Sequence, residues 1–255
     1  GGRSVVVSGG GGLVAGRFRS PERTRGEETF ANMSKPDFIK EGWYCEDIFL
    51  ARFSSEGEPV WARVAGGNSS DVPRSLSVGP DGHVHVAGGF KSAQLDVGPT
   101  VLSGSVGEDI FLLRFAPDGT VVSAKQFGAY GDNAGWSVFA GPDGRTYLAG
   151  DFSAGVLPMG DCELGNQPWV DLWGLSYPPK YGSEVFVASL DAGGIVEWAA
   201  GFGGWDSDYV YSMAADAQGN IYMTGEFCSP SISFGGEALK APDSKHSMFV
   251  VKFGQ

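Results

Sequence analysis

Carboxylate and aromatic side chains gather in the segments that join repeated parts of this chain, and they are the first candidates for binding chemistry. Three short segments, GGNSSDVPRS, GAYGDNAGWS and GGWDSDYVYS, carry aspartates, and two longer ones, residues 19–46 and 153–183, carry tryptophans and tyrosines. Aromatic rings beside carboxylates suit a neutral or cationic ligand, because sugar C–H faces and ammonium groups both pack on such rings. The predicted ligand-binding residues are Trp43, Tyr44, Asp71, Asp132, Trp169, Trp173, Tyr177, Asp206 and Asp208.

These residues also have a purely structural interpretation. Long segments need a small core of their own, which tryptophan and tyrosine can fill, since aromatic residues are mostly buried. Aspartates in turns commonly accept hydrogen bonds from nearby backbone amides. At the level of the sequence both interpretations stay open.

Metal and catalytic centres find little support in the sequence. Calcium needs several oxygen ligands from one short loop, and the nearest approach is WDSD, with Asp206 and Asp208, so no cofactor is expected. His83 and His85 occupy positions that other repeats fill with different residues, and His246 stands alone. No G-x-S-x-G motif is present. No catalytic residue is therefore predicted.

The elements that must position the candidate residues repeat along the chain. The stretch WSVFAGPDGRTYLAGDF from Trp136 has close copies that begin at Arg3, Arg74 and Tyr211. Each copy combines two apolar runs with a Gly-bearing turn and a closing Gly-x-Phe, which is the pattern of a β-hairpin. Self-similarity at this spacing indicates a repeat architecture.

Two further strands follow each hairpin. The third strand is DIFLARF, DIFLLRF, EVFVASL or MFVVKF, and the fourth is VWARVAGG, VVSAKQFGAYG or IVEWAAGFGG, with none in the last repeat. Four antiparallel strands in a meander are typical of a β-propeller blade. The sequence therefore predicts an all-β, single-domain β-propeller over residues 1–255, with strands a to d in each blade and strand a innermost. The blades span residues 3–66, 67–128, 129–203 and 204–255, and the last lacks its outer strand.

These strand and turn motifs resemble the bacterial beta-propeller repeat family labelled SBBP, which is found in exported proteins. The resemblance covers the chain from Arg3 to Phe253, and it implies a secreted or cell-surface bacterial protein. The family's name implies seven blades, whereas four repeats are present here. Three arrangements are open: a closed four-bladed ring, part of a larger propeller, or a ring completed by another copy. The bare edge of strand c in blade 4 would favour self-association.

Meander topology predicts that the irregular segments share one face. The a–b and c–d turns lie at one end of the strands, where GPDG and APDG close them tightly, and the b–c and d–a connections lie at the other end. The candidate binding residues all belong to the second face. Long loops on a rigid scaffold are common binding sites.

Positions with the same residue in every repeat are explained by packing. Rings packed between blades remove a large apolar area from water, about 1.5–3 kcal/mol each. A repeated glycine marks a close backbone approach or a bulge. These positions are Phe18, Phe90, Phe152 and Phe227 in strand b, Phe49, Phe111, Phe186 and Phe249 in strand c, and Gly16, Gly88, Gly150 and Gly225 in strand b.

Composition narrows the possible partners. The net charge of −12 argues against binding to nucleic acid or to an anionic membrane surface. No apolar run approaches the roughly 20 residues of a membrane span.

Cys162 and Cys228 belong to the b–c connections of adjacent blades, which predicts a disulfide between them and a free Cys45, although three thiols is the alternative.

Three functions follow in order of preference. The first is a non-catalytic extracellular binding or scaffold propeller that presents its loop-rich, acidic and aromatic face to a protein or glycan. The second is a structural subunit or fragment that completes a larger propeller assembly through the open edge of blade 4. The third is an enzyme that processes polysaccharide or peptide.

Overall fold

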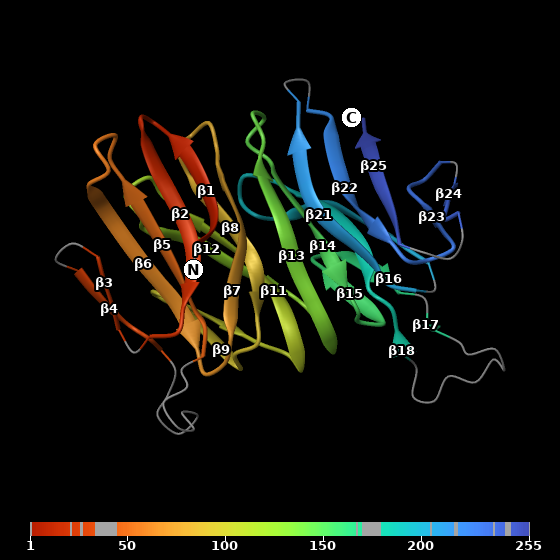
Figure 1. Cartoon of the computed structure of the whole chain (residues 1–255), viewed down its shortest axis with the longest axis horizontal. Helices are drawn as coiled ribbons and strands as arrows, with labels where there is room; N and C mark the ends of the chain where they lie inside the picture. The colour runs from red at the N-terminus through yellow and green to blue at the C-terminus, as the bar shows by residue number, and fades with distance from the viewer. Residues whose placement is uncertain are drawn as a thin grey trace.

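The computed structural model contains β-strands and connections and no helix in the part of the chain that it describes (Figure 1). Side chains are described for most of this part, but not at 23–25, 28–30, 168–169 and 180–181. The described residues are 2–20, 22–25, 28–33, 45–166, 168–169, 180–204, 206–216, 219–236, 238–242 and 246–254.

The long strands pair antiparallel in four successive meanders, which we call units 1 to 4. Each matches one predicted repeat, and in each the strands are named a to d in chain order. Unit 1 contains β1 (Gly2–Ser8), β2 (Gly11–Phe18), β5 (Asp47–Phe53) and β6 (Pro59–Gly67), and unit 2 contains β7 (Asp71–Val78), β8 (Val84–Phe90), β11 (Gly107–Phe115) and β12 (Val121–Phe127). Unit 3 contains β13 (Gly131–Ala140), β14 (Thr146–Phe152), β19 (Glu184–Leu190) and β20 (Val196–Phe202), and unit 4 contains β21 (Asp208–Ala215), β22 (Ile221–Phe227) and β25 (Ser247–Phe253).

Short hairpins occupy the connections between strands b and c. They project from the same end of the units, as the meander topology requires (Figure 1). The hairpins are β3 (Glu22–Arg25) with β4 (Glu28–Ala31), β9 (Gln94–Val97) with β10 (Thr100–Ser103), β15 (Val156–Met159) with β16 (Cys162–Gly165), β17 (Pro168–Trp169) with β18 (Lys180–Tyr181), and β23 (Ser231–Ser233) with β24 (Ala238–Lys240).

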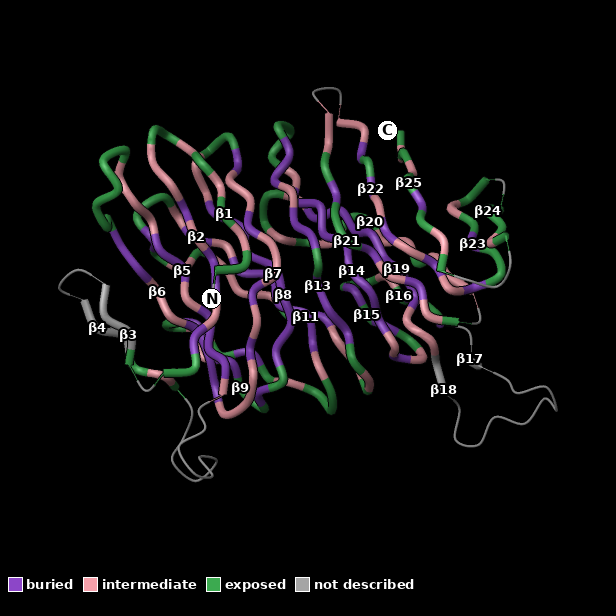
Figure 2. Tube along the Cα trace, in the orientation of Figure 1, coloured by how far each residue is buried: buried purple, intermediate pink, exposed green. Residues whose placement is uncertain are grey.

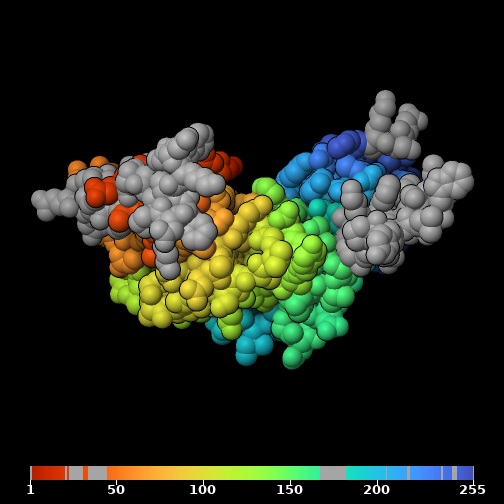
Figure 3. Space-filling model, turned by 90° about the horizontal axis from the view of Figure 1, so that it is seen from below, coloured from red at the N-terminus to blue at the C-terminus, as the bar shows by residue number. Residues whose placement is uncertain are grey.

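The four units stand side by side in an open arc. Strand β7 contacts β1 and β13, and β13 contacts β21, so the a strands are neighbours along the arc. Seen from below, the molecule is hollowed between its red and orange N-terminal part and its blue C-terminal part (Figure 3). Val5 of unit 1 and Met248 and Val250 of unit 4 are exposed, so these two units do not pack on each other and the arc is not closed into a ring. A short parallel pairing links β11 to β13, and β6 pairs with β9.

The hydrophobic core lies between successive units rather than within one sheet, and it follows the middle of the strands (Figure 2). Each unit turns one side, its front face, to the next unit, and its opposite side, its rear face, to the preceding one. At the first junction Leu13, Ala15, Ile48 and Leu50 of the unit 1 front face pack with Leu76, Val86, Phe111 and Leu113 of the unit 2 rear face. The same arrangement recurs at the other two junctions.

Strand b requires glycine at the repeated position for two physical reasons, which unit 3 illustrates. Gly150 lies opposite Phe186 of strand c and opposite Gly135 of strand a. A Cβ added at Gly150 would overlap the Ala134 carbonyl oxygen and lie 2.6 Å from the Phe186 ring. The missing side chain therefore lets the sheet bend at a bulge and lets the ring pack over the backbone.

Candidate binding site at the unit ends

Strand a of every unit contains a β-bulge at the same position. The pairing register with strand b shifts by one residue there, which leaves Arg3, Arg74, Trp136 and Tyr211 without a cross-strand partner in units 1 to 4. A bulge redirects the side chain of the extra residue, and bulges are common beside functional sites. This position holds Arg in units 1 and 2, Trp in unit 3 and Tyr in unit 4, whereas the glycine and phenylalanine of strand b are the same in all four units.

Four equivalent positions surround each bulge, and we call the residues at these positions the end cluster of the unit. The positions are the bulge residue of strand a, the residues before and after the last phenylalanine of strand b, and the residue near the start of strand c. The end clusters are Arg3, Arg17, Arg19 and Glu46 in unit 1; Arg74, Gly89, Lys91 and Glu108 in unit 2; Trp136, Asp151, Ser153 and Ser183 in unit 3; and Tyr211, Glu226, Cys228 and His246 in unit 4.

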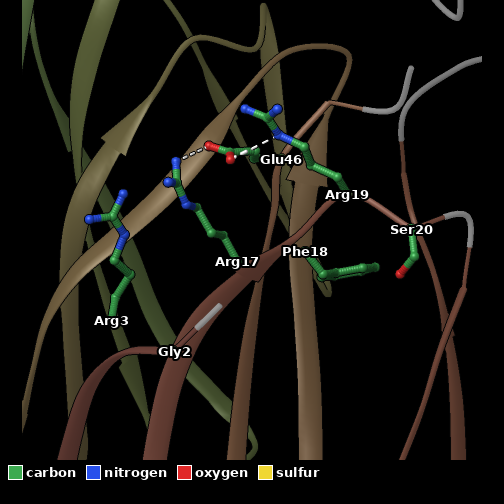
Figure 4. A pocket seen from close by; sticks show the side chains of 7 residues that line it. All are labelled: Gly2, Arg3, Arg17, Phe18, Arg19, Ser20 and Glu46. Atoms are coloured by element: carbon green, nitrogen blue, oxygen red, sulfur yellow. Dashed lines mark hydrogen bonds and ion pairs between the residues drawn. The ribbon is translucent and has the colours of Figure 1, made fainter.

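The end cluster of unit 1 lines a cavity of about 740 Å³ (Figure 4). Glu46 is buried and accepts hydrogen bonds from Arg17 Nη1 and, at 2.9 Å, from Arg19 Nε. Arg3 reaches the same cavity from the bulge and is exposed. Two guanidinium groups thus bind one carboxylate and a third lies in the same cavity, so the described lining residues carry a positive excess in a chain of net charge −12.

The end cluster of unit 2 is an ion-paired version of the same arrangement. Glu108 lies 2.5 Å from Arg74 Nη2 and 3.8 Å from Lys91 Nζ. Lys91 Nζ also lies 3.4 Å from Asp132 Oδ1, so this predicted residue joins the cluster. The Arg74 guanidinium stands 4.5 Å from the Trp136 ring centroid, a cation–π contact between units 2 and 3.

The end cluster of unit 3 buries a carboxyl group beneath an exposed indole. Burial raises the pKa of Asp151 to about 7, while a hydrogen bond from Trp136 and the positive charge of Arg74 oppose the rise. Asp151 Oδ2 is buried and accepts no hydrogen bond in the described part of the chain. Trp136 itself stays 37% exposed, so part of its ring is available to a ligand.

The end cluster of unit 4 corrects the expectation that His246 stands alone. Its Nδ1 lies 3.4 Å from Cys228 Sγ and 3.7 Å from Glu226 Oε1. Both contacts use the same ring nitrogen, whereas a nucleophile–base–acid triad needs the acid on the other ring nitrogen, so the three groups do not form such a triad. Burial, helped by the charges of Asp206, Glu226 and Asp208, raises the pKa of the Cys228 thiol, so it is protonated and weakly nucleophilic at neutral pH.

Two predicted ligand residues, Asp71 and Asp208, are fully buried and hold loops in place. Asp71 accepts hydrogen bonds from the Lys91 and Ser92 amides at 3.2 Å and from Ser92 Oγ at 2.7 Å. Asp208 accepts the equivalent bonds from Cys228 and Ser229 in unit 4. Burial raises the pKa of Asp71 to about 7 and also raises that of Asp208. These carboxyls are structural, because no ligand can reach them.

The remaining predicted residues are distributed as follows. Asp132 and Asp206 are exposed at the connection end, and Asp206 accepts a hydrogen bond from the Ser207 amide at 2.7 Å. Trp169 belongs to β17, but its side chain is not described. Trp43, Tyr44, Trp173 and Tyr177 lie outside the described residues. Within the described residues, no three His, Cys, Asp or Glu side chains converge as metal ligands would.

The predicted disulfide is absent. None of Cys45, Cys162 and Cys228 is in a disulfide, and Cys45 Sγ lies 3.8 Å from the Asn68 carbonyl oxygen. Cys162 is the first residue of β16, the second strand of the β15–β16 hairpin of unit 3, whereas Cys228 follows β22 and faces His246 in unit 4. Adjacent positions in a repeat pattern were therefore not enough to bring the two sulfur atoms together.

Sequence reasoning missed the end clusters because it looked for binding residues in the connections. Arg17, Asp151 and Glu226 lie within strands whose alternation suggests a structural role. The available signal was the contrast between a variable residue at the start of each copied hairpin and the constant Gly-x-Phe at its end.

Comparisons with known proteins give a repeat assignment. No curated protein matches the chain. A protein of unknown function from Bacteroides caccae, of known crystal structure, has a TM-score of 0.31 and 10% sequence identity, over 80% of this chain and 68% of its own. No helix in the described part of the chain has the length and apolar character needed to cross a membrane. The family model "Beta-propeller repeat" (SBBP) matches residues 197–226, which cover most of β20 and all of β21 and most of β22. This segment is therefore similar to the beta-propeller repeat of the SBBP family, the family that the strand and turn motifs resemble.

Proposed function

We propose that this chain is a non-catalytic, exported binding module of β-propeller type, with units 1 to 4 as its blades, and that it binds a carboxylate-bearing glycan at its end clusters. The proposal is carried by one observation: the cavity of unit 1 gathers Arg3, Arg17 and Arg19 around a single buried carboxylate, Glu46.

Guanidinium groups suit this ligand class because they bind carboxylates through two parallel hydrogen bonds. Glu46 fixes Arg17 and Arg19 by hydrogen bonds, which reduces the conformational entropy lost when a ligand binds. The net charge of −12 does not oppose local binding strongly, since charges beyond about 8 Å are largely screened at physiological ionic strength.

Aromatic residues at the equivalent positions of units 3 and 4 support a sugar ligand. Trp136 and Tyr211 occupy the same bulge position as Arg3, and both are exposed. Sugar rings pack their C–H faces on such side chains. Along the row of a strands, the bulge residues thus offer two guanidinium groups followed by two aromatic rings at the same end of the units.

The unit 4 cluster supports a binding role better than a catalytic one. The raised pKa of Cys228 keeps its thiol protonated, and the backbone amides of Cys228 and Ser229 already donate to Asp208. Those two amides are therefore not available to stabilise an oxyanion, which acyl transfer would need.

The test is a glycan array followed by calorimetry with oligogalacturonate as the acidic probe and a neutral cello-oligosaccharide as its comparison. We expect binding of the acidic probe that weakens with salt. Replacement of Arg3 or Arg19 by Ala should weaken it about tenfold or more, since a hydrogen bond to a charged group contributes about 1.5–3 kcal/mol. Trp136→Ala should weaken it as well.

Matched variants at the opposite end and on an outer strand serve as controls. Arg145, in the turn between β13 and β14, pairs with Glu197, and Trp198 is 39% exposed, close to the value of Trp136. Arg145→Ala and Trp198→Ala should leave binding unchanged. Equal binding of the neutral probe, or capture of a protein and no glycan, would overturn the ligand class.

A further inference from the structure

The rear face of unit 1 is exposed where the other units are covered. Val5 of β1 is 70% exposed, while the residues at the same position of the following units, Leu76, Val138 and Met213, are buried. Phe49 of β5 is half-buried, whereas its equivalents are fully buried in units 2 to 4. The difference arises because the equivalents pack on the front face of a preceding unit.

The front face of unit 4 shows the converse pattern. Met248 and Val250 of β25 are 76% and 67% exposed. Their equivalents on the front faces of the other units are buried against the next unit, and they are Ile48 and Leu50, Ile110 and Leu112, and Val185 and Val187. The chain therefore carries both halves of its own internal junction, one at each end of the arc.

The same hydrogen bond between neighbouring a strands recurs at two of the internal junctions. The Val138 amide donates to Ser75 Oγ across the junction of units 2 and 3, and the Met213 amide donates to Ser137 Oγ across the next, both at 3.0 Å. The corresponding pair at the two ends of the arc is Ser212, which is exposed on unit 4, and the amide of Val5 on unit 1. A partner that brings these two groups together would repeat a junction that already exists twice.

The bulge residues at the two ends are also complementary. At the junction of units 2 and 3 the Arg74 guanidinium lies over the Trp136 ring. The equivalent pair across the two ends is Tyr211 and Arg3, again an aromatic ring and a guanidinium group, in reversed order. Glu226 of unit 4 adds a negative charge beside Tyr211, opposite the arginine-rich end cluster of unit 1.

We infer that the unit 4 front face binds the unit 1 rear face of a second copy of this chain. The contact is head-to-tail, so two copies related by a twofold axis form it twice and close a ring. Two chains of four units give eight, which lies at the upper end of the roughly four to eight blades typical of closed propellers. A ring of three copies would exceed that range.

Native mass spectrometry and light scattering test this on the 255-residue chain over a range of micromolar concentrations. The expected mass is twice that of the 26.8 kDa monomer. Val5→Asp and Val250→Asp should each yield monomers, because each places a charge in one half of the contact. Val122→Asp, at an exposed valine of β12, is the matched control and should remain dimeric.

Mixing the two variants separates this arrangement from a general loss of association. The Val5→Asp chain keeps an intact unit 4 face, and the Val250→Asp chain keeps an intact unit 1 face, so the mixture should form a heterodimer through a single contact. Circular dichroism of each variant verifies that it is folded. A monomeric wild type, a dimer that survives both substitutions, or an equal effect of Val122→Asp would overturn the inference.

Discussion

The junction between units 2 and 3 and the rear face of unit 1 are built from the same sequence pattern but have different surroundings. Phe186 and Phe49 both lie in strand c opposite the repeated glycine of strand b. Phe186 is completely buried, and Phe49 is only half-buried. The local pattern therefore prepares a face for packing, and the neighbouring unit supplies the burial.

The largest expected effect on stability is at the junction of units 2 and 3. Phe186→Ala should lower the free energy of unfolding by about 3–5 kcal/mol, because it removes a fully buried ring and leaves a cavity between two units. Urea denaturation followed by tryptophan fluorescence measures it. A loss below 1 kcal/mol would mean that the junction contributes little to stability.

A buried carboxyl at the junction of units 1 and 2 predicts a pH effect. The pKa of Asp71 is raised by burial from 3.8 to about 7, so folding favours its neutral form, and its contribution to stability is complete below pH 4 and is lost as the pH rises to 7. Asp71→Asn should remove a slope of up to about 1.4 kcal/mol per pH unit across this interval. Unfolding titrations at several pH values measure the slope. Asn133 already occupies the equivalent position in unit 3 and accepts a hydrogen bond from the Ala154 amide, so the amide is compatible with the fold. An unchanged slope in Asp71→Asn would show that its carboxyl is ionised in the folded protein despite its burial.

Replacement of Phe49 by Ala should destabilise the protein less than replacement of Phe186. We expect Phe49→Ala to cost about 1–2 kcal/mol under conditions in which the chain is monomeric, because a half-buried ring loses only part of its transfer free energy. The same denaturation experiment, at a concentration below that of self-association, measures it. A cost equal to that of Phe186→Ala would mean that the two faces do not differ.

The smallest effect concerns the serines of strand a. Ser137→Ala removes the acceptor of the Met213 amide, which is buried at the junction of units 3 and 4, and should cost about 1 kcal/mol. Ser212→Ala, on the exposed front face of unit 4, should cost nothing measurable in the monomer. Thermal unfolding of the pair gives the comparison, and similar shifts in Tm would contradict the distinction between covered and open faces.

Several features could be derived from individual residues. The alternation of apolar and polar residues, the Gly-bearing turns and the copied hairpins predicted the strands and their antiparallel order, and the structure has them. The close approach at Gly150 and the burial of Phe152 also followed from their repetition. These features are local, and strand pairing through short turns depends on neighbours in the sequence.

The candidate site was less predictable. Asp71 and Asp208 were predicted to lie in connections and have the residue type of a ligand site, yet they begin β7 and β21 and are buried by contacts with the following b–c connection. Arg17 and Arg19 appeared to be ordinary strand and loop residues until Glu46, which is 27 residues beyond Arg19, placed its carboxylate between them. Such contacts join segments that are distant in the chain.

By itself the sequence determined the repeated strand units and the glycine and phenylalanine positions that let them stack. Only the tertiary structure decided which aspartates are buried, which end cluster holds an arginine-lined cavity, and which faces of the arc are open. The physical reason is that hydrogen bonding within a unit is set by adjacent strands, whereas the burial and pKa of a side chain depend on the unit that packs against it.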